Sequence, residues 1–281
     1  MKKYVSLLLA SIMVFALAAC GNGTGSSAPA PAAPLASSAP AASESGAALK
    51  TLKDGVLLVG MQVDYPPFEQ YAADGITPVG YDCDIIEAIA DDIGLKVEYV
   101  DTAWDGIFAG LDTEKYDCII SGVTITDERK AKYDFTQSYI QNFQCMVTLK
   151  DSNVAAKSPE ELTGLKVGYQ SETTSDIYVT DLIDKGLKAE PFEYEKILEC
   201  FSDLAAGRID AVVCDSTVTY PYLHKENTPY QLVWQQDSNP EEFGIMVKKG
   251  DTALQTALDE GLTKLKSEGA LEGFMAKWFS E

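Results

Sequence analysis

The sequence contains a single histidine, His224, among 281 residues. It also contains no Gly-x-Ser-x-Gly, His-Glu-x-x-His or Cys-x-x-Cys motif. We interpret His224 as a surface residue, so the sequence offers no histidine for a hydrolytic triad. The absent motifs are those of a nucleophile elbow, a zinc protease and a zinc site. We therefore expect no catalytic residue, no metal and no cofactor.

Basic residues are scarce, because 22 Lys and Arg stand against 43 Asp and Glu, for a net charge of −21. A negative field of this size disfavours binding to nucleic acid or to anionic lipid surfaces. It also makes copies of the chain repel one another. We therefore expect a monomer that binds no nucleic acid.

Apart from Cys20, five cysteines occur without the tight spacing of a disulfide framework, at positions 83, 118, 145, 200 and 214. Most of them lie in apolar runs, so we expect small buried hydrophobic side chains.

The N-terminus has the organisation of an export signal. Met1-Lys2-Lys3 supplies positive charge, and the apolar run Val5 to Ala19 is too short to span a bilayer. The run ends in Leu17-Ala18-Ala19-Cys20-Gly21, which resembles the lipobox of bacterial lipoproteins. That resemblance implies cleavage after residue 19 and a lipid on Cys20. The alternative is an ordinary secretory signal in which Cys20 has no role.

Residues 22–48 are nearly all Ala, Ser, Pro and Gly, which cannot bury enough apolar surface to fold. We expect residues 20–48 to be a lipidated tether. The protein would then lie on the outer face of the cell membrane, or in the periplasm if the cell has an outer membrane. The membrane contact would be the lipid anchor alone.

The remaining residues, 49–281, alternate short apolar runs with amphipathic segments, which indicates an α/β fold with mostly parallel sheets flanked by helices. Ser158, Pro159 and Glu161 predict a capping box. The expected strands include residues 56–60, 95–99, 117–123, 165–169, 188–192 and 209–214. The expected helices include residues 81–93, 104–111, 173–185 and 195–206.

The stretch from Ser121 to Lys130 predicts a strand that turns directly into a helix with Thr126 as its N-cap. Arg129 then lies in the first turn, where the helix dipole disfavours a cation. A bound carboxylate would explain its position, because free amides, the Thr124 hydroxyl and a guanidinium together attract an anion. The alternative is a surface ion pair with Asp127 or Glu128.

A similar pattern recurs in the second half of the chain. Leu111 to Ile120 resembles Leu204 to Val213, and the strand of the second copy leads to Asp215. Ligands of open α/β sheets lie beyond the carboxyl ends of strands, so Arg129 and Asp215 would face one cleft. Such a pair fits a zwitterion. The alternative is that Asp215 caps a helix that begins near Ser216.

Six motifs in order resemble those of the family 3 extracellular solute-binding proteins, the polar amino-acid receptors of ABC importers. They are Gly60-x-x-x-Asp64-Tyr65-Pro66-Pro67-Phe68, Gly80-Tyr81-Asp82-x-Asp84, Trp104-Asp105-Gly106, the Asp117 to Lys130 stretch, Gly207-Arg208-Ile209-Asp210-Ala211 and Lys277-Trp278-Phe279.

The resemblance implies a two-lobed type II periplasmic-binding-protein fold that closes on its ligand by a hinge motion. Lobe 1 would comprise residues 49–142 and 243–281, and lobe 2 residues 143–242. The crossover strands would be Gln141–Leu149 and Glu242–Val247, with the C-terminal helices returning to lobe 1.

By the same resemblance, Arg129 would bind the α-carboxylate, helped by the Thr124 amide and by Thr173 and Thr174. The α-ammonium group would contact the Gly122 carbonyl, the Thr124 hydroxyl and Asp215. Tyr65 and Trp104 would sandwich the side chain. The full set of expected ligand-binding residues is Arg129, Asp215, Thr124, Gly122, Ser121, Thr173, Thr174, Tyr65, Trp104, Gln62, Asp64 and Gln170.

Two positions depart from well-known members of the family. Gln62 stands where the histidine- and glutamine-binding branches have an acid, and Glu172 stands where a glycine is usual. With Gln170 and Asp64, these residues favour a polar ligand such as glutamine, cystine or arginine. The partners would then be a free polar amino acid and an ABC transporter permease.

Two other functions compete with the receptor. The fold resembles that of cyclohexadienyl dehydratases, in which case Glu172 would act as an acid. A sensor that feeds a signalling partner is the second alternative.

Overall fold

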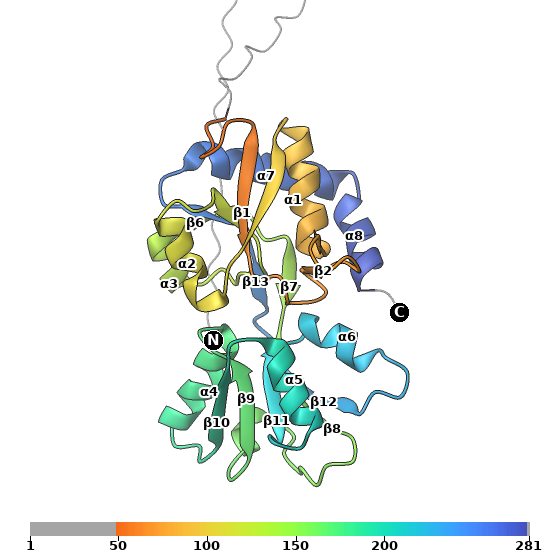
Figure 1. The fold of residues 1–281 in the computed structure, drawn as a ribbon. Coiled ribbons are helices and arrows are strands. Elements are labelled where there is room, and N and C mark those ends of the chain that lie inside the picture. Colours follow the sequence, from red (N-terminus) through yellow and green to blue (C-terminus); the bar gives the residue numbers. More distant parts are fainter. Residues whose placement is uncertain (1–48, 280–281) are drawn as a thin grey trace, which may run out of the picture. The chain divides into compact units, whose positions relative to one another are not determined.

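The computed structural model describes residues 49–279, which fall in one compact unit of the chain, residues 46–281. Within this range the chain forms two five-stranded sheets and two short two-stranded sheets. Helices accompany both large sheets (Figure 1). The predicted α/β fold is therefore confirmed. The leader, Cys20 and most of the predicted tether lie outside the described residues.

The first large sheet has the strand order β4-β1-β5-β14-β6. Strand β1 pairs in parallel with β4 and β5, whereas β14 pairs antiparallel with β5 and β6. The strands are β1 (Val56–Met61), β4 (Lys96–Asp101), β5 (Cys118–Ile119), β6 (Tyr133–Phe135) and β14 (Met246–Lys248).

The second large sheet repeats this arrangement in the order β10-β9-β11-β8-β12. Strand β9 pairs in parallel with β10 and β11, and β8 pairs antiparallel with β11 and β12. Its strands are β8 (Gln144–Leu149), β9 (Lys166–Gln170), β10 (Glu190–Tyr194), β11 (Ala211–Asp215) and β12 (Tyr230–Gln235). Both sheets are thus mixed rather than mostly parallel, because β8 and β14 run antiparallel to their neighbours.

A short antiparallel ribbon carries the chain between the two large sheets. Strand β7 (Ile140–Asn142) leads into β8, and β13 (Glu241–Phe243) precedes β14. The two pair with each other, with Glu241 opposite Asn142. The ribbon overlaps the beginnings of the two crossover segments that the resemblance implies, residues 141–149 and 242–247. The other small sheet is the hairpin of β2 (Gln70–Tyr71) and β3 (Pro78–Val79).

Helices α1, α7 and α8 contact one another beside the first sheet, so the C-terminal helices do return to it. Gly94 follows α1 with a φ of 75°, the left-handed conformation expected of a residue that ends a helix. None of the described helices combines the length and apolar character needed to cross a bilayer. The helices are α1 (Tyr81–Asp92), α2 (Trp104–Asp112), α3 (Asp127–Lys132), α4 (Thr174–Asp184), α5 (Ile197–Ala205), α6 (Tyr220–Leu223), α7 (Thr252–Ser267) and α8 (Ala270–Trp278).

Two local predictions were wrong. The capping box does not form, because Ser158 makes no side-chain cap and the Glu161 carboxylate accepts from the Lys157 amide at 2.8 Å. A short 3-10 turn, η1 (Pro159–Glu161), stands there instead. Strand β5 ends at Ile119 rather than near residue 123. The chain leaves the sheet because residues 123–125 pair with β13 and its flank.

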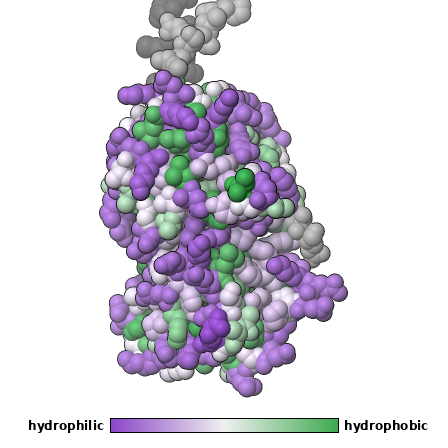
Figure 2. All heavy atoms as spheres, in the orientation of Figure 1, coloured by the Kyte–Doolittle hydropathy of each residue, from purple (hydrophilic) through white to green (hydrophobic). Residues whose placement is uncertain are grey.

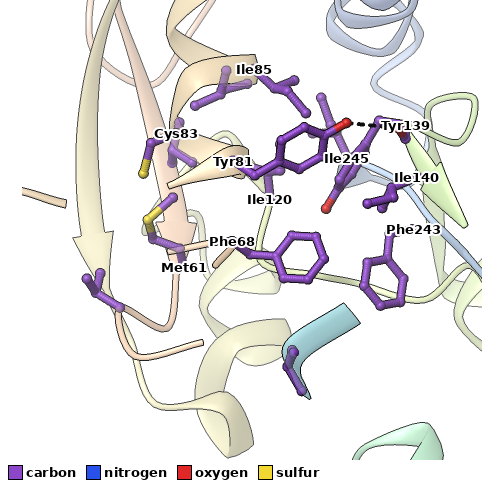
Figure 3. Packing of buried hydrophobic residues seen from close by; sticks show 14 of the residues in the cluster. Met61, Phe68, Tyr81, Cys83, Ile85, Ile120, Tyr139, Ile140, Phe243 and Ile245 are labelled. Carbon is purple, nitrogen blue, oxygen red and sulfur yellow. Dashed lines mark hydrogen bonds between the residues drawn. The ribbon is translucent and has the colours of Figure 1, made fainter. Parts of the chain in front are cut away.

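The two strands of the ribbon are anchored in the core beside α1 (Figure 3). The Phe68 and Phe243 ring centroids are 5.5 Å apart, and those of Tyr81 and Tyr139 are 6.2 Å apart. These four side chains are buried, so the first sheet holds the start of β7 and the end of β13 firmly. The five cysteines of the described chain are also buried, as expected, and none is in a disulfide.

The face shown in Figure 2 is largely hydrophilic, with apolar residues in small groups. This agrees with the acidic composition of the chain. Several polar side chains are nevertheless buried, among them Gln62, Gln170 and Asp215.

Candidate ligand-binding site

A cavity with an empty volume of about 310 Å³ lies where strands of both large sheets end. Its walls come from the last residues of β9 and β11, from the segments after β1, β5 and β9, and from the beginnings of α2, α3 and α4. The residues that line it are Gln62, Tyr65, Trp104, Ser121, Gly122, Thr124, Arg129, Gln170, Thr173, Thr174 and Asp215. All eleven are residues that the sequence predicted.

Arg129 is held in place by the turn before α3. Thr126 caps the helix by accepting from the Arg129 amide at 3.1 Å, as predicted. The guanidinium donates to the Thr124 carbonyl at 3.0 Å and lies over the rings of Trp104 and Phe108, 5.6 and 5.0 Å from their centroids. Since a guanidinium has five donors, most remain for a ligand.

The alternative for Arg129, a surface ion pair, is not what the structure shows. Asp127 pairs with Lys130 at 3.1 Å and Glu128 with Lys132 at 3.2 Å. Burial lowers the pKa of the Arg129 guanidinium, and the negative charges of Glu241 and Asp215 oppose that shift. A partly buried cation without an ion pair among the described side chains is suited to receive a carboxylate.

Asp215 ends β11 and is 5% exposed. Its carboxylate accepts from the side-chain amides of Asn142 and Gln144, at 2.6 and 2.8 Å, and from the Tyr65 hydroxyl. It does not cap a helix, so the alternative interpretation is wrong. Burial, and next the charge of Glu241, raise the pKa of Asp215 to about 7. A cationic ligand group would lower that pKa again.

The wall formed by Ser121 and Gly122 is fixed by two buried acids that the sequence analysis missed. The Ser121 hydroxyl donates to Glu69 at 2.6 Å, and the Gly122 amide donates to Asp82 at 2.9 Å. Gly122 has a φ of 56°, which an L-residue adopts only at a cost. Burial raises the pKa of Asp82 to about 7.

Glu241 is a further residue that the sequence did not single out. Its carboxylate accepts from the Thr174 hydroxyl at 3.0 Å and the Thr124 hydroxyl at 3.3 Å. It also accepts from the side-chain amides of Asn142 and Gln144, at 3.3 and 3.2 Å. One acid on the ribbon thereby joins residues from both sides of the cavity. Only its place on a crossover strand could have drawn attention to it.

The loop after β9 leads directly into α4 and contacts the opposite wall of the cavity. Thr173 caps α4 by accepting from the Asp176 amide at 3.3 Å. Glu172 has a φ of 60°, so this residue adopts the left-handed conformation that a glycine would take at low cost. The Glu172 carbonyl accepts from Trp104 Nε1 at 3.2 Å, which ties the loop to the opposite wall.

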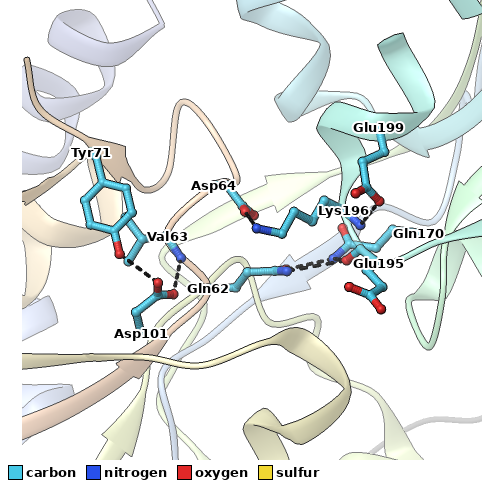
Figure 4. Close-up of polar contacts among 9 residues, drawn as sticks. All are labelled: Gln62, Val63, Asp64, Tyr71, Asp101, Gln170, Glu195, Lys196 and Glu199. Atoms are coloured by element: carbon cyan, nitrogen blue, oxygen red, sulfur yellow. Dashed lines mark hydrogen bonds and ion pairs between the residues drawn. The ribbon is translucent and has the colours of Figure 1, made fainter. Parts of the chain in front are cut away.

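Asp64 is the one predicted residue that does not line the cavity. Its carboxylate forms an ion pair with Lys196 at 2.5 Å, close to a contact between Gln62 and Gln170 (Figure 4). The amide of Gln170 donates to Gln62 Oε1 at 2.8 Å. Lys196 precedes α5 and was not predicted, because nothing local to its sequence signals a partner so far along the chain.

Among the described residues, no group of three or more His, Cys, Asp or Glu side chains is arranged to hold a metal ion. The cavity therefore presents one guanidinium, one carboxylate, two aromatic rings, hydroxyls and carboxamides. This set can bind charged and hydrogen-bonding groups.

Comparison with protein-family models matches residues 57–281 to the bacterial extracellular solute-binding proteins, family 3. L-cystine-binding protein TcyJ of Escherichia coli (strain K12) is 30% identical over 231 residues, which cover 82% of this chain and 85% of that protein. L-cystine-binding protein TcyA of Bacillus subtilis (strain 168) is 30% identical over 281 residues, which cover 100% of this chain and 98% of that one.

Solved structures of similar proteins also match this chain. Holo ArgBP from T. maritima matches with 37% identity and a TM-score of 0.70, over 80% of this chain and 96% of that chain. An ancestral arginine-binding protein bound to glutamine matches with 36% identity and a TM-score of 0.74, over 82% and 100% of the two chains. The similar proteins are thus named for different amino acids.

Proposed function

Because this chain belongs to the family 3 bacterial extracellular solute-binding proteins, we propose that it captures a free polar amino acid and delivers it to an ABC importer. It is a binding protein and not an enzyme, since its curated relatives are binding proteins. Glu172, the residue that a dehydratase would need as an acid, does not line the cavity.

The observation that carries the proposal is the pairing of Arg129 and Asp215 in one cavity. The guanidinium is complementary to an α-carboxylate and the carboxylate to an α-ammonium group. Asp215 ends β11 of the second large sheet, whereas Arg129 lies in α3, which follows β5 of the first large sheet. A free amino acid would therefore contact both halves at once, and its binding energy would favour the closed arrangement.

The two halves proposed to close on the ligand are residues 49–142 with 243–281, and residues 143–242. The ribbon of β7 and β13 would be the hinge, because it is where the chain passes between the two large sheets. Contacts such as Trp104 Nε1 to the Glu172 carbonyl would form on closure.

The remaining parts of the proposal concern location. We place the protein outside the cytoplasmic membrane, held by a lipid on Cys20 and a tether, with the permease of an ABC transporter as its partner. Replacement of Cys20 by Ala should release the protein from the membrane fraction. Retention of this variant on the membrane would contradict the lipid anchor.

A thermal-shift screen of the purified protein against the common amino acids and cystine tests the receptor function. A ligand present at 100 times its dissociation constant adds about 2.7 kcal/mol to the free energy of unfolding. For a chain of this size we expect Tm to rise by roughly 5–10 °C.

The Arg129→Ala variant is the control for this screen. It should respond at least ~10-fold more weakly, because a charge-assisted hydrogen bond contributes about 1.5–3 kcal/mol. The absence of a shift with every amino acid would count against the receptor.

A further inference from the structure

The orientation of the Gln170 carboxamide is fixed by its neighbours. Gln170 is 4% exposed, and its Nε2 donates to the Glu195 carbonyl at 3.1 Å and to Gln62 Oε1 at 2.8 Å. A backbone carbonyl can only accept, so Nε2 and not Oε1 must face Glu195. Figure 4 shows the two glutamine side chains pointing toward each other.

This orientation uses both hydrogens of Gln170 Nε2 and leaves Oε1 unpaired. Gln170 Oε1 is buried and has no hydrogen-bond partner among the described residues. Buried polar atoms are nearly always paired, and Gln170 lines the cavity. A ligand that supplies an N–H donor would satisfy this acceptor.

Gln62 offers the complementary group. Its Oε1 accepts from Gln170, and its Nε2 makes one contact, with the Glu195 carbonyl at 3.4 Å. Since a carboxamide nitrogen carries two hydrogens, one remains for an acceptor. The pair of glutamines therefore presents one free acceptor and one free donor.

The charges around the cavity exclude a third ionic group. Arg129 and Asp215 are the ionised side chains among those that line it, and the two ends of a free amino acid would neutralise both. Asp64 is close to the glutamine pair, but Lys196 neutralises it. A charged ligand side chain would be buried here without a counterion, which is strongly unfavourable.

Glu241 does not supply that counterion at the glutamine pair. Its carboxylate contacts Thr124, Thr174, Asn142 and Gln144. No described hydrogen bond joins Gln62 or Gln170 to Glu241 or Asp215. The two polar clusters are thus separate parts of the site.

From these observations we infer that the ligand is an amino acid whose side chain is uncharged and ends in a carboxamide. Its N–H donates to Gln170 Oε1 and its carbonyl accepts from Gln62 Nε2. This inference rests on the proposed function and narrows it to glutamine and its carboxamide or ureido analogues, although relatives are named for arginine and cystine.

Titration calorimetry with ligands of matched length tests the inference on the unaltered protein. Glutamine should bind at least ~10-fold more tightly than methionine, which lacks the donor, because an unpaired buried group is costly. Glutamate and arginine should bind more weakly than glutamine by a similar factor or more. Methionine within threefold of glutamine, or arginine tighter than glutamine, would overturn it.

Variants at position 170 provide a second test. Gln170→Glu replaces the neutral wall by a negative charge, so the preference should change from glutamine to arginine or lysine. Gln170→Leu should reduce the ratio of glutamine to methionine affinities to less than about threefold. An unchanged ratio in Gln170→Leu would refute the assignment, and if that variant does not fold, the ligand series above decides.

Gln231→Leu is the matched control. Gln231 is also a glutamine of the second sheet, and its amide donates to Thr148 and Leu149, outside the cavity. This change should leave the ligand ratios as they are. If no amino acid binds at all, the proposed function fails. If amino acids bind but do not discriminate for a carboxamide, only the present inference fails.

Discussion

The affinity for an amino acid should increase as the pH rises through neutrality. Asp215 is buried beside Glu241, and both effects raise its pKa to about 7. In the proposed complex, the ligand ammonium group contacts the ionised carboxylate of Asp215. Below pH 7, binding must therefore displace a proton from Asp215, and each unit of lower pH costs up to 1.36 kcal/mol, a factor of ten.

The size of this effect follows from the pKa. At pH 5, about 1% of a carboxyl group with a pKa near 7 is ionised, and at pH 7.5 about 75% is. The dissociation constant should therefore fall by roughly 50–100-fold between these values. Near pH 6, binding should release about 0.9 proton, which calorimetry in buffers of different ionisation enthalpy measures directly.

Two variants identify the group responsible. Asp215→Asn should bind weakly at every pH and lose most of the pH dependence. Asp82 also has its pKa raised to about 7 by burial, but it does not line the cavity. Asp82→Asn should therefore keep the dependence. An affinity that is flat or decreases from pH 5 to 7.5, or an equally steep profile in Asp215→Asn, would refute the reasoning.

Three further variants test single contacts. Arg129→Lys keeps the charge but loses the planar fork, so calorimetry should show affinity reduced by about 10–100-fold, and a change below twofold would contradict the assigned role. The ion pair of Lys196 with Asp64 is partly exposed, at 44% and 16%, so Lys196→Met should change affinity by less than about fivefold; a larger loss would show that the pair stabilises closure. Gly122→Ala forces an L-residue to φ 56° and places a Cβ 3.0 Å from the Tyr65 ring. Its free energy of unfolding should fall by roughly 1–2 kcal/mol, visible as a lower Tm, and an unchanged Tm would exclude the strain.

Features that depend on neighbouring residues could be predicted from the sequence. Thr126 caps α3 because its hydroxyl reaches an amide three residues away, and Gly94 ends α1 because the chain must turn there. The lining of the cavity was predicted in part from the rule that ligands lie beyond the carboxyl ends of strands, and otherwise from the resemblance to a known family. Ser158 shows the limit of such signals. The Glu161 carboxylate was expected to accept from the Ser158 amide, but it accepts from the Lys157 amide instead.

Contacts between distant segments could not be predicted in the same way. Lys196 and Asp64 are 132 positions apart by their numbering, and Glu241 meets Thr124 across 117 positions. No periodicity or motif around these residues specifies their partners. Most residues that line the cavity were therefore foreseeable, but the acids that contact them, such as Glu69 and Glu241, were not.

The proposed hinge and the proposed ammonium site share residues, which would link the charge of the ligand to closure. Asn142 and Gln144 lie on the chain entering the second sheet, and each of their amides contacts both Asp215 and Glu241. Glu241 lies on the returning strand, and the segment with Thr124 pairs with that strand at Phe243. An ammonium group that neutralises Asp215 would therefore reduce repulsion between two acids at the crossover itself. This lower repulsion between Asp215 and Glu241 would favour the arrangement in which Glu241 contacts both Thr124 and Thr174. The positive charge of the ligand ammonium group would in this way also stabilise the proposed closed state.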